Sequence, residues 1–156
     1  MITVDVAGLE VLDKLAEFIE SKVPEFLARC AELGVTVAEW HYSMAVYDGT
    51  NDVAVTWEER GANTVAIIAT GTAVLFIEFG AGSLMGYGHP EPMDYGPGTY
   101  PGHGHWDDPN GWWLPKAVQE ETGKEKSYGN APTMGMYNAR KEIEMELTRI
   151  AQEVFG

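Results

Sequence analysis

Phe-Gly-Ala-Gly (79–82) and Gly-Asn-Ala-Pro (129–132) enclose the stretch that decides how this chain of 156 residues is organised. Residues 80–132 hold eleven of the 18 glycines, three of the five tryptophans and three of the four histidines, and six of the eight prolines lie strictly inside. So much glycine and proline is incompatible with regular structure throughout, yet disordered linkers are poor in tryptophan and tyrosine. We therefore expect residues 80–131 to form an ordered insertion into a compact scaffold, here called the excursion, that contacts another molecule.

An amphipathic helix is predicted before the excursion, because apolar residues recur at steps of three and four between residues 9 and 33. Gly34 is placed to end this helix. Pro24 lies inside the pattern and lacks a backbone donor, so we expect a kink there, or a break with Ser21 capping the second part.

A second amphipathic helix is predicted after the excursion, between residues 133 and 155, from the same spacing. Pro132 suits its first turn and Asn130 is placed to cap it. Neither long helix can bury its apolar face alone, so both are expected to cover a sheet.

That sheet is predicted between residues 35 and 70, where the apolar period changes to two. Turn sequences occur at 48–51 (Asp-Gly-Thr-Asn) and 60–63 (Arg-Gly-Ala-Asn). They divide the segment into an antiparallel three-stranded meander, which gives an α+β fold for a single domain. The inward-facing residues of the three strands are Trp40, Tyr42, Met44 and Val46; Val53, Val55 and Trp57; and Val65, Ile67 and Ala69.

Residues 71–80 are apolar and too short for periodicity to distinguish strand from helix. Thr72 could cap a short helix here. Glu78, between Ile77 and Phe79, is either a buried carboxylate or the exposed edge of an amphipathic turn, and its spacing favours the exposed edge.

The excursion itself divides into two parts. Closely spaced turn sequences predict an irregular loop over 81–110. Residues 111–128 predict a hairpin, with Trp112 and Trp113 on the first arm, a turn at 122–123 and a return over 124–128.

The charge is strongly acidic, at -14 from 24 acidic and 10 basic residues. Such a surface repels phosphate backbones, which disfavours direct DNA binding and allows the protein to lie beside DNA without adhering. No apolar run approaches the roughly 20 residues of a membrane helix, so we expect a protein that stays in the cytosol where it is made. The single cysteine, Cys30, lies on an apolar helical face and is expected to be a small buried thiol.

A metal site is the most tempting chemistry in the excursion. His103, His105 and two adjacent aspartates, Asp107 and Asp108, lie within six residues, with His89 and Glu91 upstream. Imidazole and carboxylate ligands suit zinc, but no third ligand stands at a diagnostic spacing. We therefore expect hydrogen-bonded histidines and no bound metal or other cofactor.

Catalytic motifs are not recognisable. Paired acids at 58–59, 107–108 and 120–121 invite comparison with glycosidases, but neighbours in sequence need not face each other across a bond. No serine, cysteine or lysine lies in a nucleophile motif. The sequence therefore predicts no enzyme.

Aromatic residues in a Gly/Pro framework are better explained as a subunit or partner interface, because large amphipathic rings dominate such contacts. About half of them are expected to pack the excursion onto its own domain. The candidate interface residues are Tyr87, Tyr95, Tyr100, Trp106, Trp112 and Trp113.

Glu-Phe-Gly-Ala-Gly (78–82) after a short apolar segment, and Asn-Ala-Pro (130–132) before a C-terminal helix, resemble the head-tail joining or tail-completion minor structural proteins of long-tailed bacteriophages and prophages. The insert 96–102 and the Trp-Asp-Asp-Pro-Asn-Gly-Trp-Trp segment (106–113) are similar to one subgroup. The order of elements matches over nearly the whole chain. Family members more often carry Pro-Phe and a second proline where this chain has Pro-Thr-Met-Gly-Met (132–136).

The resemblance implies a virion structural protein of the neck, without catalysis, at the head-tail junction. Its partners would be further copies of itself in a ring of six, the neighbouring connector and tail tube proteins, and DNA passing through the channel without sequence-specific contact. A ring needs heterologous contacts, and we expect the excursion to supply one patch. The alternatives are a carbohydrate-binding or cell-wall-acting protein that uses the tryptophans, and an acidic inhibitor that mimics DNA.

Overall fold

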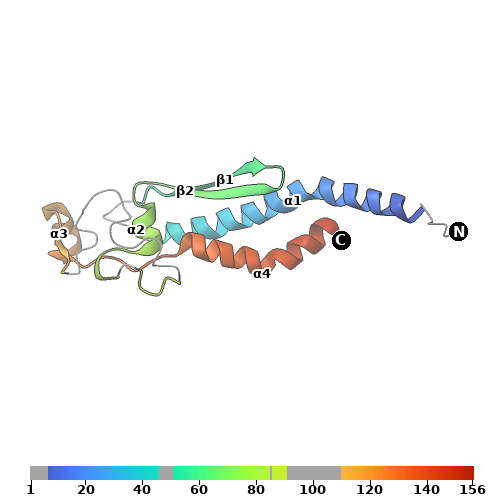
Figure 1. Cartoon of the computed structure of the whole chain (residues 1–156). Helices are drawn as coiled ribbons and strands as arrows, with labels where there is room; N and C mark the ends of the chain where they lie inside the picture. The colour runs from blue at the N-terminus through green and yellow to red at the C-terminus, as the bar shows by residue number, and fades with distance from the viewer. Residues whose placement is uncertain (1–6, 46–50, 85, 91–109) are drawn as a thin grey trace.

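The computed structural model describes residues 7–45, 51–84, 86–90 and 110–156 (Figure 1). Helices α1 and α4 lie side by side and antiparallel, and the β1–β2 hairpin packs along α1 (Figure 1). Helix α2 and the described parts of the excursion gather at the end where α4 begins, and α1 projects at the opposite end. The elements are α1 (Ala7–Ser43), β1 (Ala54–Gly61), β2 (Thr64–Thr70), α2 (Val74–Phe79), the 3₁₀ turn η1 (Gly82–Leu84), β3 (Trp112–Trp113), α3 (Lys116–Thr122), β4 (Lys126–Ser127) and α4 (Gly135–Phe155).

The α+β class is confirmed, but the three-stranded meander is wrong, because residues 35–43 continue α1 instead of forming a strand. Burial shows the helical period: Gly34, Ala38 and Tyr42 are buried at steps of four, whereas Trp40 and Met44 remain largely exposed. The apparent alternation of aromatic residues therefore does not describe a buried strand face. The turn predicted at 48–51 lies mostly outside the described residues.

The predicted interruptions of the first helix are also wrong. Helix α1 runs through Pro24 to Ser43, and Ser21 donates its hydroxyl to the Phe18 carbonyl 2.7 Å away instead of capping a new helix. Gly34 lies inside α1 at its closest approach to the neighbouring elements. A Cβ at this position would collide with the Ile67 side chain and come 2.8 Å from Ile143 Cδ1.

The β1–β2 hairpin is confirmed, with Val55 opposite Ala69 and Trp57 opposite Ile67. These residues share the face toward α1, as the period of two predicts. A register shift between Glu59 and Gly61 disturbs the ladder before the turn.

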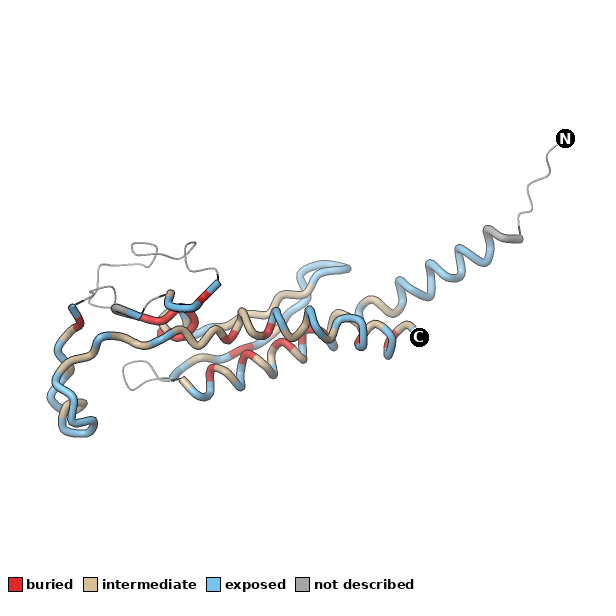
Figure 2. Tube along the Cα trace, turned by 90° about the horizontal axis from the view of Figure 1, so that it is seen from below, coloured by how far each residue is buried: buried red, intermediate tan, exposed pale blue. Residues whose placement is uncertain are grey.

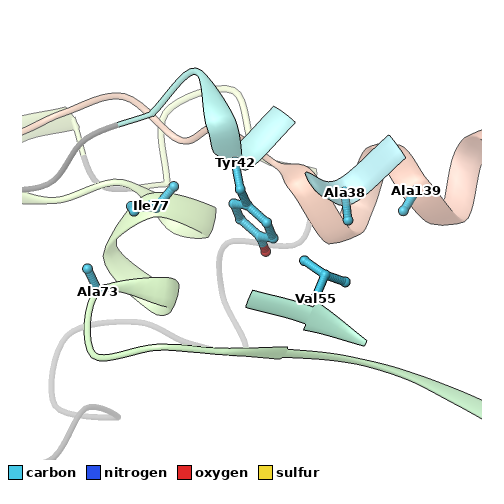
Figure 3. Close-up of a cluster of buried hydrophobic side chains, with 6 residues drawn as sticks. All are labelled: Ala38, Tyr42, Val55, Ala73, Ile77 and Ala139. Atoms are coloured by element: carbon cyan, nitrogen blue, oxygen red, sulfur yellow. The ribbon is translucent and has the colours of Figure 1, made fainter. Parts of the chain in front are cut away.

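The main hydrophobic core joins α1, the hairpin, α2 and α4 at one end of the molecule (Figure 3). Tyr42 reaches from α1 to the centre of this cluster, and its ring packs on Gly135 at the start of α4, where a Cβ would lie 2.8 Å from the ring Cζ atom. The buried members are Ala38, Tyr42, Val55, Ala73, Ile77 and Ala139.

A second cluster closes α1 against the C-terminal half of α4. Cys30, Ile150 and Val154 are buried there, which confirms the expectation of a buried thiol. Phe26 and Phe155 stack at a centroid distance of 5.6 Å at the limit of this contact. The seam between the two long helices therefore ends near Phe26.

Residues 71–80 include helix α2, whose N-cap is Ala73 and not Thr72, and Asp52 holds the two residues that precede the helix. Asp52 accepts hydrogen bonds from the Thr72 amide and hydroxyl at 2.7 Å each, and from the Ala73 amide at 3.3 Å. Hydrogen bonds from the Thr72 hydroxyl and amide hold the pKa of Asp52 below its usual range.

The two ends of the excursion cross each other in close contact. The Ala81 amide donates to the Asn130 carbonyl at 2.9 Å. Gly129 (φ +103°) lies so close that a Cβ would overlap the Ala81 carbonyl oxygen, and Gly82 (φ +63°) meets the Tyr128 carbonyl in the same way. Glycine is needed here both for positive φ and for the approach of two backbones.

The two arms of the hairpin predicted over 111–128 do pair, but the turn predicted at 122–123 is wrong, because a helix connects them. Strands β3 and β4 pair antiparallel, with Trp112 opposite Ser127 and Trp113 opposite Lys126. Helix α3 occupies most of the segment between them, and Gly123 ends it in the left-handed conformation. Most of the predicted loop 81–110 lies outside the described residues.

Helix α4 confirms the predicted C-terminal helix, with a start that differs from expectation. It begins at Gly135 after Met134, which has a left-handed φ of 59° and provides no side-chain cap. Asn130 instead donates its amide to the Phe76 carbonyl of α2 at 3.0 Å. None of the helices in the described ranges combines the length and apolar character needed to cross a membrane.

Candidate functional site

Glu78 caps α4 from a distant part of the chain, and its expected exposure at the edge of a turn is wrong. The residue is only 5% exposed. Its Oε2 atom accepts a hydrogen bond from the Met136 amide at 3.0 Å, and its Oε1 atom accepts one from the Tyr137 amide at 3.1 Å. A carboxylate at this position satisfies two otherwise unpaired amides and is favoured by the positive end of the helix dipole.

A third donor comes from α1. The Tyr42 hydroxyl donates to Glu78 Oε2 at 2.8 Å inside the core. Burial, and then the adjacent Glu78 carboxylate, raise the pKa of Tyr42 well above its ordinary value. The hydroxyl therefore remains protonated and continues to donate, so one carboxylate joins α1, α2 and α4.

His89 connects the outgoing end of the excursion to this group. Its Nε2 atom lies 3.6 Å from Glu78 Oε1, and both side chains are almost completely buried. The imidazole also packs on Phe79 at a centroid distance of 4.6 Å and on Tyr137 at 5.8 Å. We call Tyr42, Glu78 and His89 with the two α4 amides the carboxylate node.

The carboxylate node joins α1, α2 and α4 within the chain. Three donors of the same chain bond the Glu78 oxygens. Within the described ranges, no cluster of three histidine, cysteine or acidic side chains could hold a metal ion. His103, His105, Asp107, Asp108 and Glu91 lie outside those ranges.

An open groove of about 600 Å³ adjoins the node between the hairpin, α2 and α4. Glu78 and His89 contribute to its wall, together with apolar side chains that include Ile68 and Leu75. Arg60 on β1 and Arg140 on α4 also line it. The groove wall therefore combines apolar side chains with two arginines and one carboxylate.

The opposite end of the molecule bears a surface with no partner in the described part of the chain. Helix α1 has 37 residues and α4 has 21, so the first turns of α1 project beyond the seam (Figure 2). Every side chain from residue 10 to residue 21 is exposed. We call residues 10–21 the overhang. Its large apolar side chains are exposed by 44–65%, and they are Val11, Leu12, Leu15, Phe18 and Ile19.

The predicted aromatic interface is only partly described. Tyr87 is 75% exposed and Trp113 is 67% exposed, whereas Trp112 is half-buried in the β3–β4 pair. Lys126 places its ammonium 5.2 Å from the centroid of the Trp113 ring, so this ring is partly engaged within the chain. Tyr95, Tyr100 and Trp106 lie outside the described residues. Their role in an interface stays a prediction.

Comparison with protein-family models, with curated proteins and with solved structures found no match to this chain.

Proposed function

We propose that this chain is a structural subunit of the neck of a long-tailed bacteriophage or prophage, a tail-completion or tail-terminator protein that forms a ring. The ring, of six copies, joins the tail to the DNA-filled head. In this role the protein acts in the virion, after assembly in the host cytoplasm, and has no catalytic activity. Its neighbours are the connector and tail tube proteins.

The overhang is the observation that carries the proposal. Isolated apolar residues are common on protein surfaces, but five large ones on consecutive turns of one projecting helix form a surface for another subunit. The scaffold behind it is held by the buried carboxylate node, which fixes the direction of α1 relative to α4. A rigid protomer with a projecting apolar helix is suited to assembly.

The residues that carry the family resemblance support the same proposal in a different way. Glu78 caps α4, and the glycines at 80, 82 and 129 allow the ends of the excursion to cross. The resemblance therefore rests on residues with a defined structural task. The acidic charge suits a protein that lies beside a DNA channel without retaining the DNA.

An early stop codon in this gene of the phage or prophage tests the role. We expect electron microscopy of the lysate to show DNA-filled heads and separate tails, with joined particles restored when the full chain is supplied from a plasmid. Normal infectious particles in the absence of the protein would refute the neck role. Binding of the purified chain to glycans or cell wall would then support the carbohydrate-binding alternative.

A further inference from the structure

We infer that the overhang of one copy docks into the groove of the next copy, so that the two surfaces form the heterologous contact of the ring. This inference rests on the proposed function for the ring, and the contact itself can be tested without a virion. The occupant of the groove is residues 10–21 of a second copy of this chain.

The apolar pattern of the overhang fits a groove better than a flat surface. With 100° per residue, Val11, Leu15 and Phe18 lie on one side of the helix, and Leu12 and Ile19 lie beside them. The carboxylates lie on the opposite side. A helix of this kind inserts its apolar face into a hydrophobic groove and keeps its charged face in water.

The groove offers the complementary surface on the same chain. Ala66 and Ile68 of β2 are half-buried and lie opposite Glu58 and Thr56 in the hairpin register. The groove also includes Ile67 and Ala69 from the face toward α1, so it follows strand β2 along the edge of the hairpin. Leu75 adds an exposed apolar side chain from α2.

Charge favours the groove over the pairing of two overhangs. Between residues 10 and 21 the chain has four carboxylates and one lysine, so two overhangs side by side would repel. The groove presents Arg60 and Arg140. Each is bonded to an acid of its own chain, Arg60 to Glu58 at 2.6 Å and Arg140 to Glu144 at 3.5 Å, and such exposed pairs exchange partners at little cost.

The positions of the two surfaces determine the type of assembly. The overhang projects at the end where α1 begins, and the groove lies beside α2 toward the other end (Figure 1). A contact between two different patches leaves one patch of each kind unfilled on every pair, so further copies can add, into a ring if the rotation closes and into a filament if it does not. The contact is therefore of the type that the proposed ring requires.

A mixing experiment with the full chain tests this contact. Leu15→Asp disables the overhang and Ala66→Glu disables the groove, and we expect each variant alone to weaken self-association at least about tenfold in sedimentation velocity. Ser21→Asp, which adds the same charge away from the apolar face, and Thr64→Glu, at the exposed start of β2, are the matched controls and should assemble like the wild type.

Mixing the two disabled variants distinguishes the geometries. One intact overhang then meets one intact groove, so we expect a heterodimer that does not grow. No association in the mixture, a wild-type chain that is monomeric up to about 1 mM, or unchanged assembly of both variants would each overturn the inference. Circular dichroism checks folding, and Arg140→Glu replaces Ala66→Glu if that variant is unfolded.

Photo-cross-linking locates the occupant directly. With benzoylphenylalanine at position 15, we expect intermolecular cross-links to residues 60–69 or 136–140. Cross-links to residues 10–26 of another copy would show a two-fold pair of overhangs, and a groove protected by residues 91–109 of its own chain would show a different occupant; both results overturn the inference. A different outcome is that the stop-codon lysate contains separate heads and tails while Leu15→Asp and Ala66→Glu leave self-association unchanged. That pair of results would leave the neck role intact and reject only the contact.

Discussion

Replacing Glu78 by glutamine keeps the shape of the buried carboxylate node and removes its charge. The carboxylate accepts hydrogen bonds at 2.8, 3.0 and 3.1 Å, and glutamine offers one acceptor oxygen in place of two. At least one donor, such as the Tyr137 amide, then faces an NH₂ group. A buried donor without an acceptor costs about 1–3 kcal/mol, and the lost charge at the helix N-terminus costs about 1 kcal/mol more. We expect Glu78→Gln to lower the free energy of unfolding by about 2–4 kcal/mol.

The assay is urea and thermal unfolding followed by circular dichroism. In a domain of this size 1 kcal/mol shifts the melting temperature by about 2–4 °C, so the variant should melt about 10 °C below the wild type. Glu144→Gln is the matched control, because Glu144 is an exposed carboxylate paired with Lys141 on the same helix. We expect this control to leave the unfolding midpoint unchanged.

A double-mutant cycle with Tyr42→Phe shows whether the loss comes from the node itself. Tyr42→Phe alone should cost about 1 kcal/mol, and in the Glu78→Gln background it should cost clearly less, because its acceptor is already altered. The reasoning is refuted if Glu78→Gln melts with the wild type, or if the two effects simply add.

Three further predictions concern other parts of the scaffold. Gly129→Ala would overlap the Ala81 carbonyl and should lower the melting temperature strongly, whereas Gly123→Ala, also strained by its positive φ but with free space around it, should lower it less. Burial raises the pKa of Cys30, so the native thiol should react with Ellman's reagent far more slowly at pH 8 than in urea, and equal rates would contradict its burial. Hydrogen bonds from the Thr72 hydroxyl and from the amides just before α2 hold the pKa of Asp52 low. Their contribution to stability is present above the unfolded pKa of about 3.9 and is lost as the pH falls through the lower folded pKa. Asp52→Asn should therefore flatten the fall of the urea midpoint below about pH 4.

Local periodicity was sufficient to locate the β1–β2 hairpin and the amphipathic parts of the two long helices. The β1–β2 hairpin and both amphipathic helices follow from apolar spacing and turn residues. The apolar residues of 35–43 fit the period of two of a strand as well as the period of 3.6 of a helix. Helix forms because Ala38 and Tyr42 pack against elements that are distant in sequence. Tertiary contacts of this kind override local propensity and cannot be read from one segment.

The carboxylate node was missed for the same reason. Glu78 meets the Met136 amide across 58 positions of sequence and the Tyr42 hydroxyl across 36. A helix without its own capping side chain is a usable signal, because Met134 precedes α4 and the orphan amides need an acceptor from elsewhere. A buried acid beside a glycine-rich crossing is one place to seek that acceptor.

These assignments separate the residues that specify the fold from those available to a partner. The Glu78 oxygens accept hydrogen bonds from donors of the same chain, and Gly82 and Gly129 are enclosed by the opposing backbone, so all three serve the fold first. The family resemblance rests on residues with this internal structural role. It therefore supports the proposed fold more directly than it identifies a partner. What the chain contacts must be decided by exposed surfaces, of which the overhang is apolar and unpaired in the described structure. Substitutions in the overhang should therefore change assembly while the chain stays folded, and substitutions in the node should lower the melting temperature.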